Sequence, residues 1–544
     1  MIKTALKYLK WLSVHSRGVH GRLVANVLLG ILNVGLNMAF IVVCKRIVDL
    51  ATGVVGGNIL HYTIAVLALI VLRLTVAAFN ERIESLASSR LNFTIRQDLY
   101  SQILNSTWAG KERRHSGDTL NRLESDVSSV VSVICSDAPQ FITTSVQLVA
   151  ATVLMCTMEW KLALLLVLMT PLFLLFSKLF FRKMRRMTRG IRDTESRIQS
   201  HIQESLQNRL VIKSMETEDA MVERLEALQN MEYDQVVERT RFSVFARTVV
   251  GAAFSLGYIS AFLWGAYGIL HGAITFGVMT AFLQLVGQIQ RPVVNMTRQV
   301  PAFVNATASI DRLMELEDAP LDEKGEPEMM EGPAGIKVDG VTFRYPDGEH
   351  DVLHGVSFDF PPLSRTAIVG ETGIGKSTLV KLMLSLMKPA EGKILVYDGD
   401  REVPASERTR CNMVYVPQGN TLFSGTIREN LLMGNPAADD DRLEDALRTA
   451  AADFVMDLPE GLDTKCGEGG AGLSEGQCQR IAIARGLLRP GSIMLLDEFS
   501  SSLDPETEAR LMENLTKFAG HKTMIFIAHR EKVAAYCERS LRLG

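Results

Sequence analysis

The chain has 544 residues, which is more than one hydrophobic core normally organises, so at least two domains are expected. Hydrophobic residues make up 47% of it, which is high for a soluble protein and indicates membrane spans. The net charge of −3 hides an asymmetry, because residues 1–320 carry 33 Lys+Arg against 25 Asp+Glu and the remainder carries 25 against 36. A basic half rich in apolar runs and an acidic half without them are typical of one domain in a lipid bilayer and one in water. A single soluble domain is therefore excluded.

The cysteines are scattered, with no Cys-x-x-Cys pair and no histidine cluster beside them. We interpret them as ordinary thiols in a reducing compartment, not as a disulfide framework or a metal site. The seven positions are Cys44, Cys135, Cys156, Cys411, Cys466, Cys478 and Cys537.

Residues 1–18 are expected to form an amphipathic helix ahead of the membrane domain. Its apolar face carries Ile2, Ala5, Leu6, Leu9 and Leu12, and its basic face carries Lys3, Lys7 and Lys10. Such a helix lies on the cytoplasmic leaflet with its lysines near lipid phosphates. A solvated amphipathic tail is the alternative. A signal peptide is not indicated, because no small-residue cleavage site follows.

Six near-uninterrupted apolar stretches follow, and each reaches the roughly 20 residues that a helix needs to cross a bilayer. They fall at about 22–44, 59–80, 138–158, 160–181, 244–270 and 273–294. Buried helices of a large soluble protein are the alternative, but six such stretches in one half are too many and too long for it. We therefore expect an all-α, six-helix transmembrane domain over residues 19–316.

The basic residues predict the orientation of this domain, because cytoplasmic loops are enriched in lysine and arginine. Seven of them fall between residues 182 and 197, after the fourth span, and four between 111 and 122, after the second. Both termini and both long loops are therefore expected to be cytoplasmic. The long loops are rich in helix formers, so spans two to five should continue past the bilayer, with turns near 109–118 and 206–215.

One polar stripe runs down the sixth span. Its members recur at spacings of four, three, four and three residues, and they are Gln284, Gln288, Arg291, Asn295 and Arg298. Polar side chains at membrane depth are costly unless they face protein or water, and an arginine costs at least about 2.5 kcal/mol. We expect the first four to line a central cavity, where Arg291 would favour substrates with an anionic group. A polar seam that locks neighbouring helices is the alternative.

A linker is expected at 317–335, EDAPLDEKGEPEMMEGPAG, where Pro, Gly and acidic residues break all periodicity. Beyond it, over 336–544, short β runs such as TAIVG, NMVYVPQ, SIMLLDE and TMIFIAH alternate with helical segments. This pattern predicts an α/β domain with a largely parallel core sheet.

The segment GETGIGKST begins at the last residue of the run TAIVG and opens an apolar helix, which is the context of a phosphate-binding P-loop. Its backbone N–H groups would close round the β-phosphate of ATP, aided by the helix dipole. Lys376 would reach the β- and γ-phosphates, and the Ser377 hydroxyl would ligate Mg²⁺. The ATP-binding residues predicted here are Gly370, Thr372, Gly373, Gly375, Lys376, Ser377 and Thr378.

The run Ile493-Met494-Leu495-Leu496 is expected to be a buried strand that delivers two carboxylates at its end, Asp497 and Glu498. Asp497 is placed to hold Mg²⁺ through water, and Glu498 can polarise the attacking water as a general base. Such a pair is often a simple turn, but a P-loop about 120 residues upstream favours the catalytic interpretation. Together these motifs predict a P-loop NTPase domain.

The sequence LSEGQ at 473–477 closely resembles the signature of the ABC (ATP-binding cassette) family. Further matches to that family are Gln418 in YVPQ, SSLD at 501–504, His529 in IAHR and Tyr345 in FRYPD. The membrane half resembles the exporter branch at 117–127, 204–219 and 306–316. The resemblance covers essentially the whole chain.

The resemblance implies that two cassettes sandwich two ATP molecules head to tail, so that each site is shared between subunits. Ser474 and Gly476 would contact the ATP held by the partner's P-loop, and Tyr345 would stack on adenine. His529 would contact the γ-phosphate, and Gln418 would join the magnesium ligands and report nucleotide state to the membrane half. The resemblance adds Gln477 and Asp504 to the ATP-binding residues and makes Glu498, His529 and Gln418 the catalytic set.

The chain departs from the family pattern in three places. Glu475 adds a negative charge to the signature where glycine is usual, but the neighbouring Ser474 and Gly476 are intact and activity is expected to survive. Residues 499–502 read FSSS, a mild polarity change. About fifteen residues follow His529, so the last strand and helix should be short or missing.

We expect ATP-driven export by a dimeric half-transporter, because importers normally keep their membrane and ATPase parts in separate chains. The alternative is a nucleotide-gated channel or the regulatory half of a heterodimer. We favour a homodimer in a cell membrane, by compactness a bacterial inner membrane. ATP, Mg²⁺, lipid and an exported substrate are the expected ligands, and nucleic acid is not. The sequence does not distinguish among a drug, a lipid and a peptide as the exported substrate.

Overall fold

The computed structural model describes residues 2–107, 116–323, 325–345, 348, 350–467, 470, 472–518, 521–528 and 531–544. The chain forms two compact units. The first contains residues 1–100 and 120–315, and the second contains residues 101–119 and 316–544. The first is helical, and the second contains the β-sheets, which agrees with the predicted fold class.

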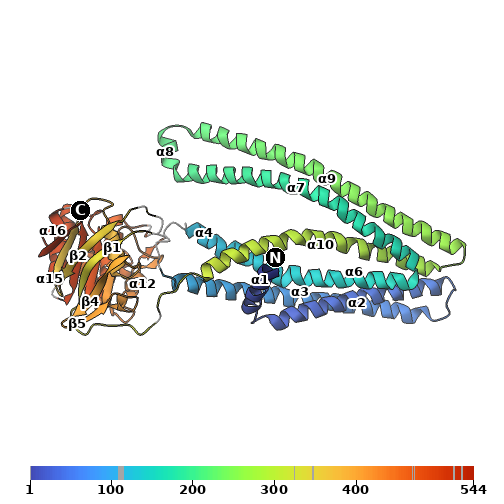
Figure 1. The fold of residues 1–544 in the computed structure, drawn as a ribbon, viewed down its shortest axis with the longest axis horizontal. Helices are drawn as coiled ribbons and strands as arrows, with labels where there is room; N and C mark the ends of the chain where they lie inside the picture. The colour runs from blue at the N-terminus through green and yellow to red at the C-terminus, as the bar shows by residue number, and fades with distance from the viewer. Residues whose placement is uncertain are drawn as a thin grey trace. The chain divides into compact units, whose positions relative to one another are not determined.

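The helical unit is built from a few very long helices (Figure 1). Their bounds are α1 Ile2–His15, α2 His20–Ala51, α3 Ile59–Leu104, α4 Ser116–Asn121, α5 Val127–Ser132, α6 Ala138–Met158, α7 Trp160–Gln207, α8 Arg209–Ser214, α9 Glu218–Leu270 and α10 Phe276–Glu317. Two π-helical turns, η2 Arg122–Asp126 and η3 Val133–Asp137, connect α4, α5 and α6 into one continuous rod.

These helices contain the predicted spans. By length and composition, four helical stretches of the described residues could cross a membrane: His20–Ala51, Ile59–Leu104, Asp118–Met158 and Glu218–Leu270. Helices α7 and α10 run over the remaining two predicted spans. With 46, 48 and 53 residues, α3, α7 and α9 are about 70–80 Å long, more than twice a hydrocarbon core of about 30 Å. They therefore continue well past a bilayer, as predicted.

One of the two predicted turns can be followed in the structure. The short helix α8 lies within 206–215 and joins α7 to α9, which lie side by side (Figure 1). The other predicted turn, at 109–118, falls largely on residues 108–115, which are outside the described residues.

The helices of the first unit pack closely where side chains are small. A Cβ on Gly30 of α2 would overlap Thr143 of α6, so only glycine allows this approach of the two helices. A buried cluster joins α2, α6, α9 and α10 and includes Ile41, Ala151, Met155, Ala261, Ala281, Phe282, Leu285, Val286 and Ile289. This packing fixes the face that α10 turns toward α6.

The second unit contains two larger sheets. One is antiparallel in the order β2-β1-β4-β5, and the other is parallel in the order β11-β3-β10-β9-β6. The first comprises β1 Gly335–Phe343, β2 Leu353–Phe360, β4 Glu391–Asp398 and β5 Arg401–Pro404. The second comprises β3 Arg365–Val369, β6 Met413–Val416, β9 Ile493–Asp497, β10 Thr523–Ala528 and β11 Arg539–Arg542. A two-stranded ribbon pairs β7 Gly425–Thr426 with β8 Lys465–Cys466.

Helices cover the parallel sheet, which accounts for the apolar runs of its inner strands β9 and β10. They are α11 Lys376–Met383, α12 Ile427–Leu432, α13 Asp440–Thr449, α14 Glu475–Leu488, α15 Pro505–Phe518 and α16 Glu531–Ala534. One buried cluster lies between the two sheets and α11, and another lies among the parallel sheet and α12 to α15. The last two elements of the described chain are the four-residue helix α16 and the four-residue strand β11. All seven cysteines are free thiols.

Candidate functional site

The parallel sheet brings the predicted catalytic segments to one edge. In the register of β9 with its neighbours, Val416 lies opposite Leu496, and Asp497 lies opposite Ile527. The segments that follow β3, β6, β9 and β10 therefore emerge together at the carboxyl ends of the strands. In open α/β sheets, ligands bind at this edge.

The loop between β3 and α11 has the geometry of a phosphate-binding loop. Gly373 and Gly375 have φ of 88° and 105°, a left-handed conformation that favours glycine. The Lys376 ammonium is held by the carbonyl oxygens of Gly370 and Glu371, at 2.7 and 2.8 Å. Burial lowers the pKa of Lys376, and the nearby carboxylates of Glu498 and Asp497 partly counteract this. The lysine thus lies at the centre of the loop, close to both predicted acidic residues.

Glu498 adopts a backbone conformation that is rare for a residue with a side chain. Its φ is 46°, and such a conformation costs about 1–3 kcal/mol unless the surroundings impose it. Its backbone N–H donates to the Ile527 carbonyl, and its carboxylate accepts a 2.7 Å hydrogen bond from the Gln418 amide. The fold therefore joins two members of the predicted catalytic set, which are 80 residues apart in the chain.

Asp497 fits the predicted magnesium site. Its side chain is 4% exposed, and burial raises its pKa, against hydrogen bonds from Ser377 and Tyr415 that lower it. The Tyr415 hydroxyl donates to Oδ2 at 3.2 Å, and Oδ1 is buried without a hydrogen-bond partner among the described residues. A buried carboxylate oxygen beside a serine hydroxyl provides the oxygen ligands that Mg²⁺ prefers.

The signature segment forms the start of α14. Ser474 is the N-cap, where its hydroxyl accepts from the Gln477 N–H and the Gln477 side chain accepts from the Ser474 N–H. A Cβ on Gly476 would lie 2.8 Å from the Ser502 carbonyl oxygen, so this glycine permits close packing of the helix start. The arrangement presents a capped helix N-terminus, a common site for phosphate.

The remaining predicted ATP-binding residues have different surroundings. The Tyr345 hydroxyl lies 3.1 Å from the Thr378 hydroxyl, so this aromatic ring is anchored at the start of α11. Asp504 accepts hydrogen bonds from the N–H groups of Glu506 and Thr507 and caps α15, which lowers its pKa. His529 lies outside the described residues.

Two side chains of the site were missed by the sequence analysis. Gln479, which is fully buried on α14, donates to the Glu498 carbonyl at 3.2 Å and accepts from the Ser502 hydroxyl at 2.7 Å. It thus ties the signature helix to the carboxylate turn. Tyr415, on β6, contacts Asp497. A glutamine in the otherwise apolar face of the 477–488 helix was the available signal for Gln479.

The polar stripe of α10 is only partly described, because the side chains of Arg291 and Arg298 lie outside the described part. Gln284 and Gln288 are half-buried, and Asn295 is exposed. The Gln147 amide of α6 donates to the Gln288 side-chain oxygen at 2.5 Å. At Gln288, therefore, the stripe has the contact expected of a polar seam.

The sequence analysis also missed polar groups elsewhere in the helical unit. Arg73 lies within the second predicted span, 5.6 Å above the Phe40 ring, and its Nε is buried without a hydrogen-bond partner among the described residues. A single arginine inside the apolar run of 59–80 was a readable signal. Asp49, 3% exposed, accepts from the Gly277 N–H at the start of α10.

A helical unit with long membrane-length helices and a P-loop unit with paired carboxylates define a membrane-spanning P-loop ATPase. The family described as "ABC transporter transmembrane region" matches residues 23–293, and the family described as "ABC transporter" matches residues 353–501. The chain belongs to the ABC transporter family and has the exporter-type organisation, in which one chain carries both parts. As a half-transporter it acts as a dimer and couples ATP hydrolysis to export across a membrane.

Similar proteins cover the chain almost from end to end. "Putative multidrug export ATP-binding/permease protein YgaD" of Bacillus subtilis (strain 168) is 26% identical over 526 residues, covering 94% of this chain and 90% of that protein. A Staphylococcus aureus (strain NCTC 8325 / PS 47) protein of the same description is 28% identical over 535 residues, 95% and 92% of the two. The solved "Structure of a bacterial Atm1-family ABC exporter with ATP bound" has a TM-score of 0.79 at 24% identity, covering 97% and 94% of the two chains, and supports the fold.

Proposed function

We propose that Glu498 is the general base for ATP hydrolysis and that Gln418 holds its carboxylate in position. The 2.7 Å hydrogen bond between them, at a backbone φ of 46°, is the observation that carries this assignment. Energy stored in an unusual backbone conformation is typical of functional sites. A carboxylate fixed in this way can accept a proton from water, and such a base accelerates hydrolysis by about 10²–10⁴-fold.

Ser377 and Asp497 would hold Mg²⁺, with Gln418 completing the set, and the ion would neutralise charge on the phosphates. Lys376 binds the β- and γ-phosphates once it exchanges its two carbonyl partners for them. Tyr345 orients the adenine, and His529 contacts the γ-phosphate. The capped N-terminus of α14 offers Ser474, Gly476 and Gln477 to the nucleotide of the partner subunit.

The working unit in this proposal is a homodimer in a bacterial cytoplasmic membrane, with both termini in the cytoplasm. The competent motifs support it, since Lys376, Asp497, Glu498 and Gln418 all converge in this one chain. The chain purified alone should hydrolyse ATP with positive cooperativity. Inactivity until a different half-transporter is added would establish a heterodimer instead.

The substrate class that fits best is an amphiphile with an anionic group. Arg73 lies 14 residues from the start of α3 and Arg291 lies 15 residues from the start of α10, so both are about 21–22 Å along their helices. Two arginines at this common depth, within a core of about 30 Å, would attract a negative group from the cytoplasmic leaflet. The multidrug names of the bacterial relatives agree with an amphiphilic substrate.

A substrate panel tests this proposal. ATPase activity in lipid nanodiscs should rise with anionic amphiphiles and acidic lipids, and less with cationic drugs or peptides of matched size. Cysteines placed singly at 284, 288 and 291 should react with a water-soluble maleimide that is applied from the cytoplasmic side. The labelling at 284 and 291 should change when ATP is trapped in the protein. Stimulation by cationic compounds alone would contradict the assignment.

A further inference from the structure

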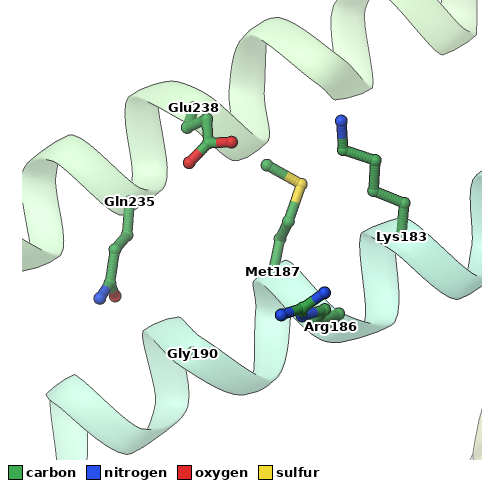
Figure 2. A pocket seen from close by; sticks show the side chains of 6 residues that line it. All are labelled: Lys183, Arg186, Met187, Gly190, Gln235 and Glu238. Atoms are coloured by element: carbon green, nitrogen blue, oxygen red, sulfur yellow. The ribbon is translucent and has the colours of Figure 1, made fainter.

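A cavity of about 560 Å³ lies between α7 and α9 (Figure 2). Its lining comes from two helices: Lys183, Arg186, Met187 and Gly190 on α7, and Gln235 and Glu238 on α9. This volume is within the range of about 300–1,000 Å³ that is usual for small-molecule sites. Gly190 contributes to the space, because a Cβ built on it would meet no atom within 4 Å.

The cavity contains opposite charges that do not pair with each other. Among the described residues, Lys183, Arg186 and Glu238 form no ion pair. The Lys183 ammonium lies 4.8 Å over the Phe242 ring, and Figure 2 shows Glu238 extending from the opposite helix. The Gln235 side-chain oxygen accepts from the Thr194 hydroxyl, which orients its amide as a further donor. The cavity therefore offers cationic donors and, facing them, one carboxylate.

The cavity lies along the helices at the cytoplasmic edge of the bilayer. Lys183 lies 23 residues from the start of α7 at Trp160, and Glu238 lies 32 residues from the end of α9 at Leu270. These separations are about 35 and 48 Å along the helices. Against a hydrocarbon core of about 30 Å and a full bilayer of about 40–45 Å, Lys183 lies at the depth of the lipid headgroups and Glu238 at their cytoplasmic border, where the outermost group of a headgroup would reach it.

We propose that this cavity binds the headgroup of an aminophospholipid from the cytoplasmic leaflet. Its phosphate lies on Arg186 and Lys183, and its ammonium lies on Glu238. An arginine beside a lysine suits a phosphate diester, since arginine can bind two of its oxygens at once. A headgroup without an amino group would leave the Glu238 carboxylate next to the phosphate without a cation of its own. The acyl chains would follow the apolar sequence before Lys183 on α7 and after Phe242 on α9.

Lipid retention and selectivity test this site directly. The full-length protein, extracted mildly from membranes containing phosphatidylethanolamine and phosphatidylglycerol, is examined by native mass spectrometry. We expect retained phosphatidylethanolamine to fall about fivefold in Arg186→Ala, the loss expected for one basic contact with a headgroup. Arg185→Ala is the matched control, because it removes the neighbouring exposed arginine, which does not line the cavity.

Two further variants separate the headgroup from other ligands. Gly190→Leu should expel the lipid by filling the cavity without removing a charge, and the strong helix propensity of leucine keeps α7 intact. Glu238→Gln should remove the preference for phosphatidylethanolamine over phosphatidylglycerol while phosphate binding persists. Displacement of the lipid by phosphoethanolamine but not by inorganic phosphate would support recognition of the whole headgroup.

Three outcomes would overturn the proposal. One is equal retention of phosphatidylethanolamine in Arg186→Ala and Arg185→Ala. The second is a preference for phosphatidylglycerol that Glu238→Gln leaves unchanged. The third is efficient cross-linking of a cysteine at 190 to a second copy of the chain, with no lipid retained, which would make the cavity part of the dimer interface. Basal ATPase measurements in each variant confirm that the protein is folded.

Discussion

The two units organise their polar groups in different ways. In the nucleotide unit, a parallel sheet aligns the ends of β3, β6, β9 and β10, so that short motifs in the sequence converge at one edge. In the helical unit, polar groups are paired one by one between helices, as in Gln147 with Gln288 and Asn26 with the Cys135 carbonyl. The register of a sheet brings polar side chains together in one site, whereas the packing of helices distributes them along the length of the helices.

This difference decides what a single substitution does. At the sheet edge, side chains such as Glu498 are proposed to act on a reacting nucleotide, so their loss should affect turnover much more than stability. Between helices, side chains such as Asp126 hold neighbouring segments together, so their loss should affect stability first. The following variants test that division, starting with the largest expected effect.

Glu498→Gln should keep ATP binding and lower ATP turnover about a hundredfold or more, because a positioned base contributes about 10²–10⁴. Stability should change little, since glutamine has the same length and can still accept a hydrogen bond from Gln418. Phosphate release and binding of a fluorescent ATP analogue are the measurements. Lys376→Ala is the matched contrast and should weaken binding itself. Near-normal turnover in Glu498→Gln would remove this residue from the mechanism.

The motifs of the proposed nucleotide site can be read from the sequence because they are local. The P-loop, the carboxylate pair and the YVPQ glutamine each occupy a few consecutive residues, and the α/β pattern implies that they share one edge. Gln479 was not predicted to belong to the site, because its role depends on burial against the Glu498 carbonyl and no short sequence pattern reveals that contact. The sequence also did not separate the antiparallel sheet of β1, β2, β4 and β5 from the parallel one.

The helical unit was predicted in outline but not in its contacts. Hydropathy predicted six spans, and long helices run over all six ranges, four of them apolar enough by length and composition to cross a membrane. The cytoplasmic side assigned from the basic residues stays a prediction. The partner of Gln288, in contrast, is 141 residues away on α6. The spacing of the stripe fixed a helical face but not what that face touches. Pairings of this kind depend on which helices pack together.

Asp126 forms another of these pairings, with three contacts to two side chains. Its carboxylate, 4% exposed, accepts from the Ser309 hydroxyl at 2.8 Å and the Arg312 Nε at 2.7 Å, and Arg312 Nη2 adds a further contact. Arg312→Ala should lower the unfolding free energy by about 1.5–3 kcal/mol, the usual contribution of hydrogen bonds to a charged group. Thermal unfolding in detergent with intrinsic fluorescence measures it.

The control for Arg312 is the more exposed pair on the same two segments. The Glu315 carboxylate is 51% exposed and lies 2.9 Å from Arg122, so Glu315→Ala should cost about 0–1 kcal/mol. The double variant Asp126→Asn with Arg312→Met should lose less than the sum of its two single changes. Additive losses, or equal effects of Arg312→Ala and Glu315→Ala, would show that the buried pairing does not hold these segments.

The smallest expected effect concerns Gln147 and Gln288, where seam and cavity make opposite predictions. In a seam, the two amides satisfy each other at membrane depth, and double-mutant cycles of such pairs average about 0.6 kcal/mol. We expect Gln147→Leu, Gln288→Leu and the double variant to show this coupling in unfolding, with substrate-stimulated ATPase unchanged. Gln284→Leu, one turn away on the same helix, should show no coupling to Gln147→Leu. Gln288 lines the transport path if Gln288→Leu shifts the substrate concentration for half-maximal stimulation of the ATPase and shows no coupling to Gln147→Leu. In that case the helical unit also collects its polar side chains in one site, as the nucleotide unit does.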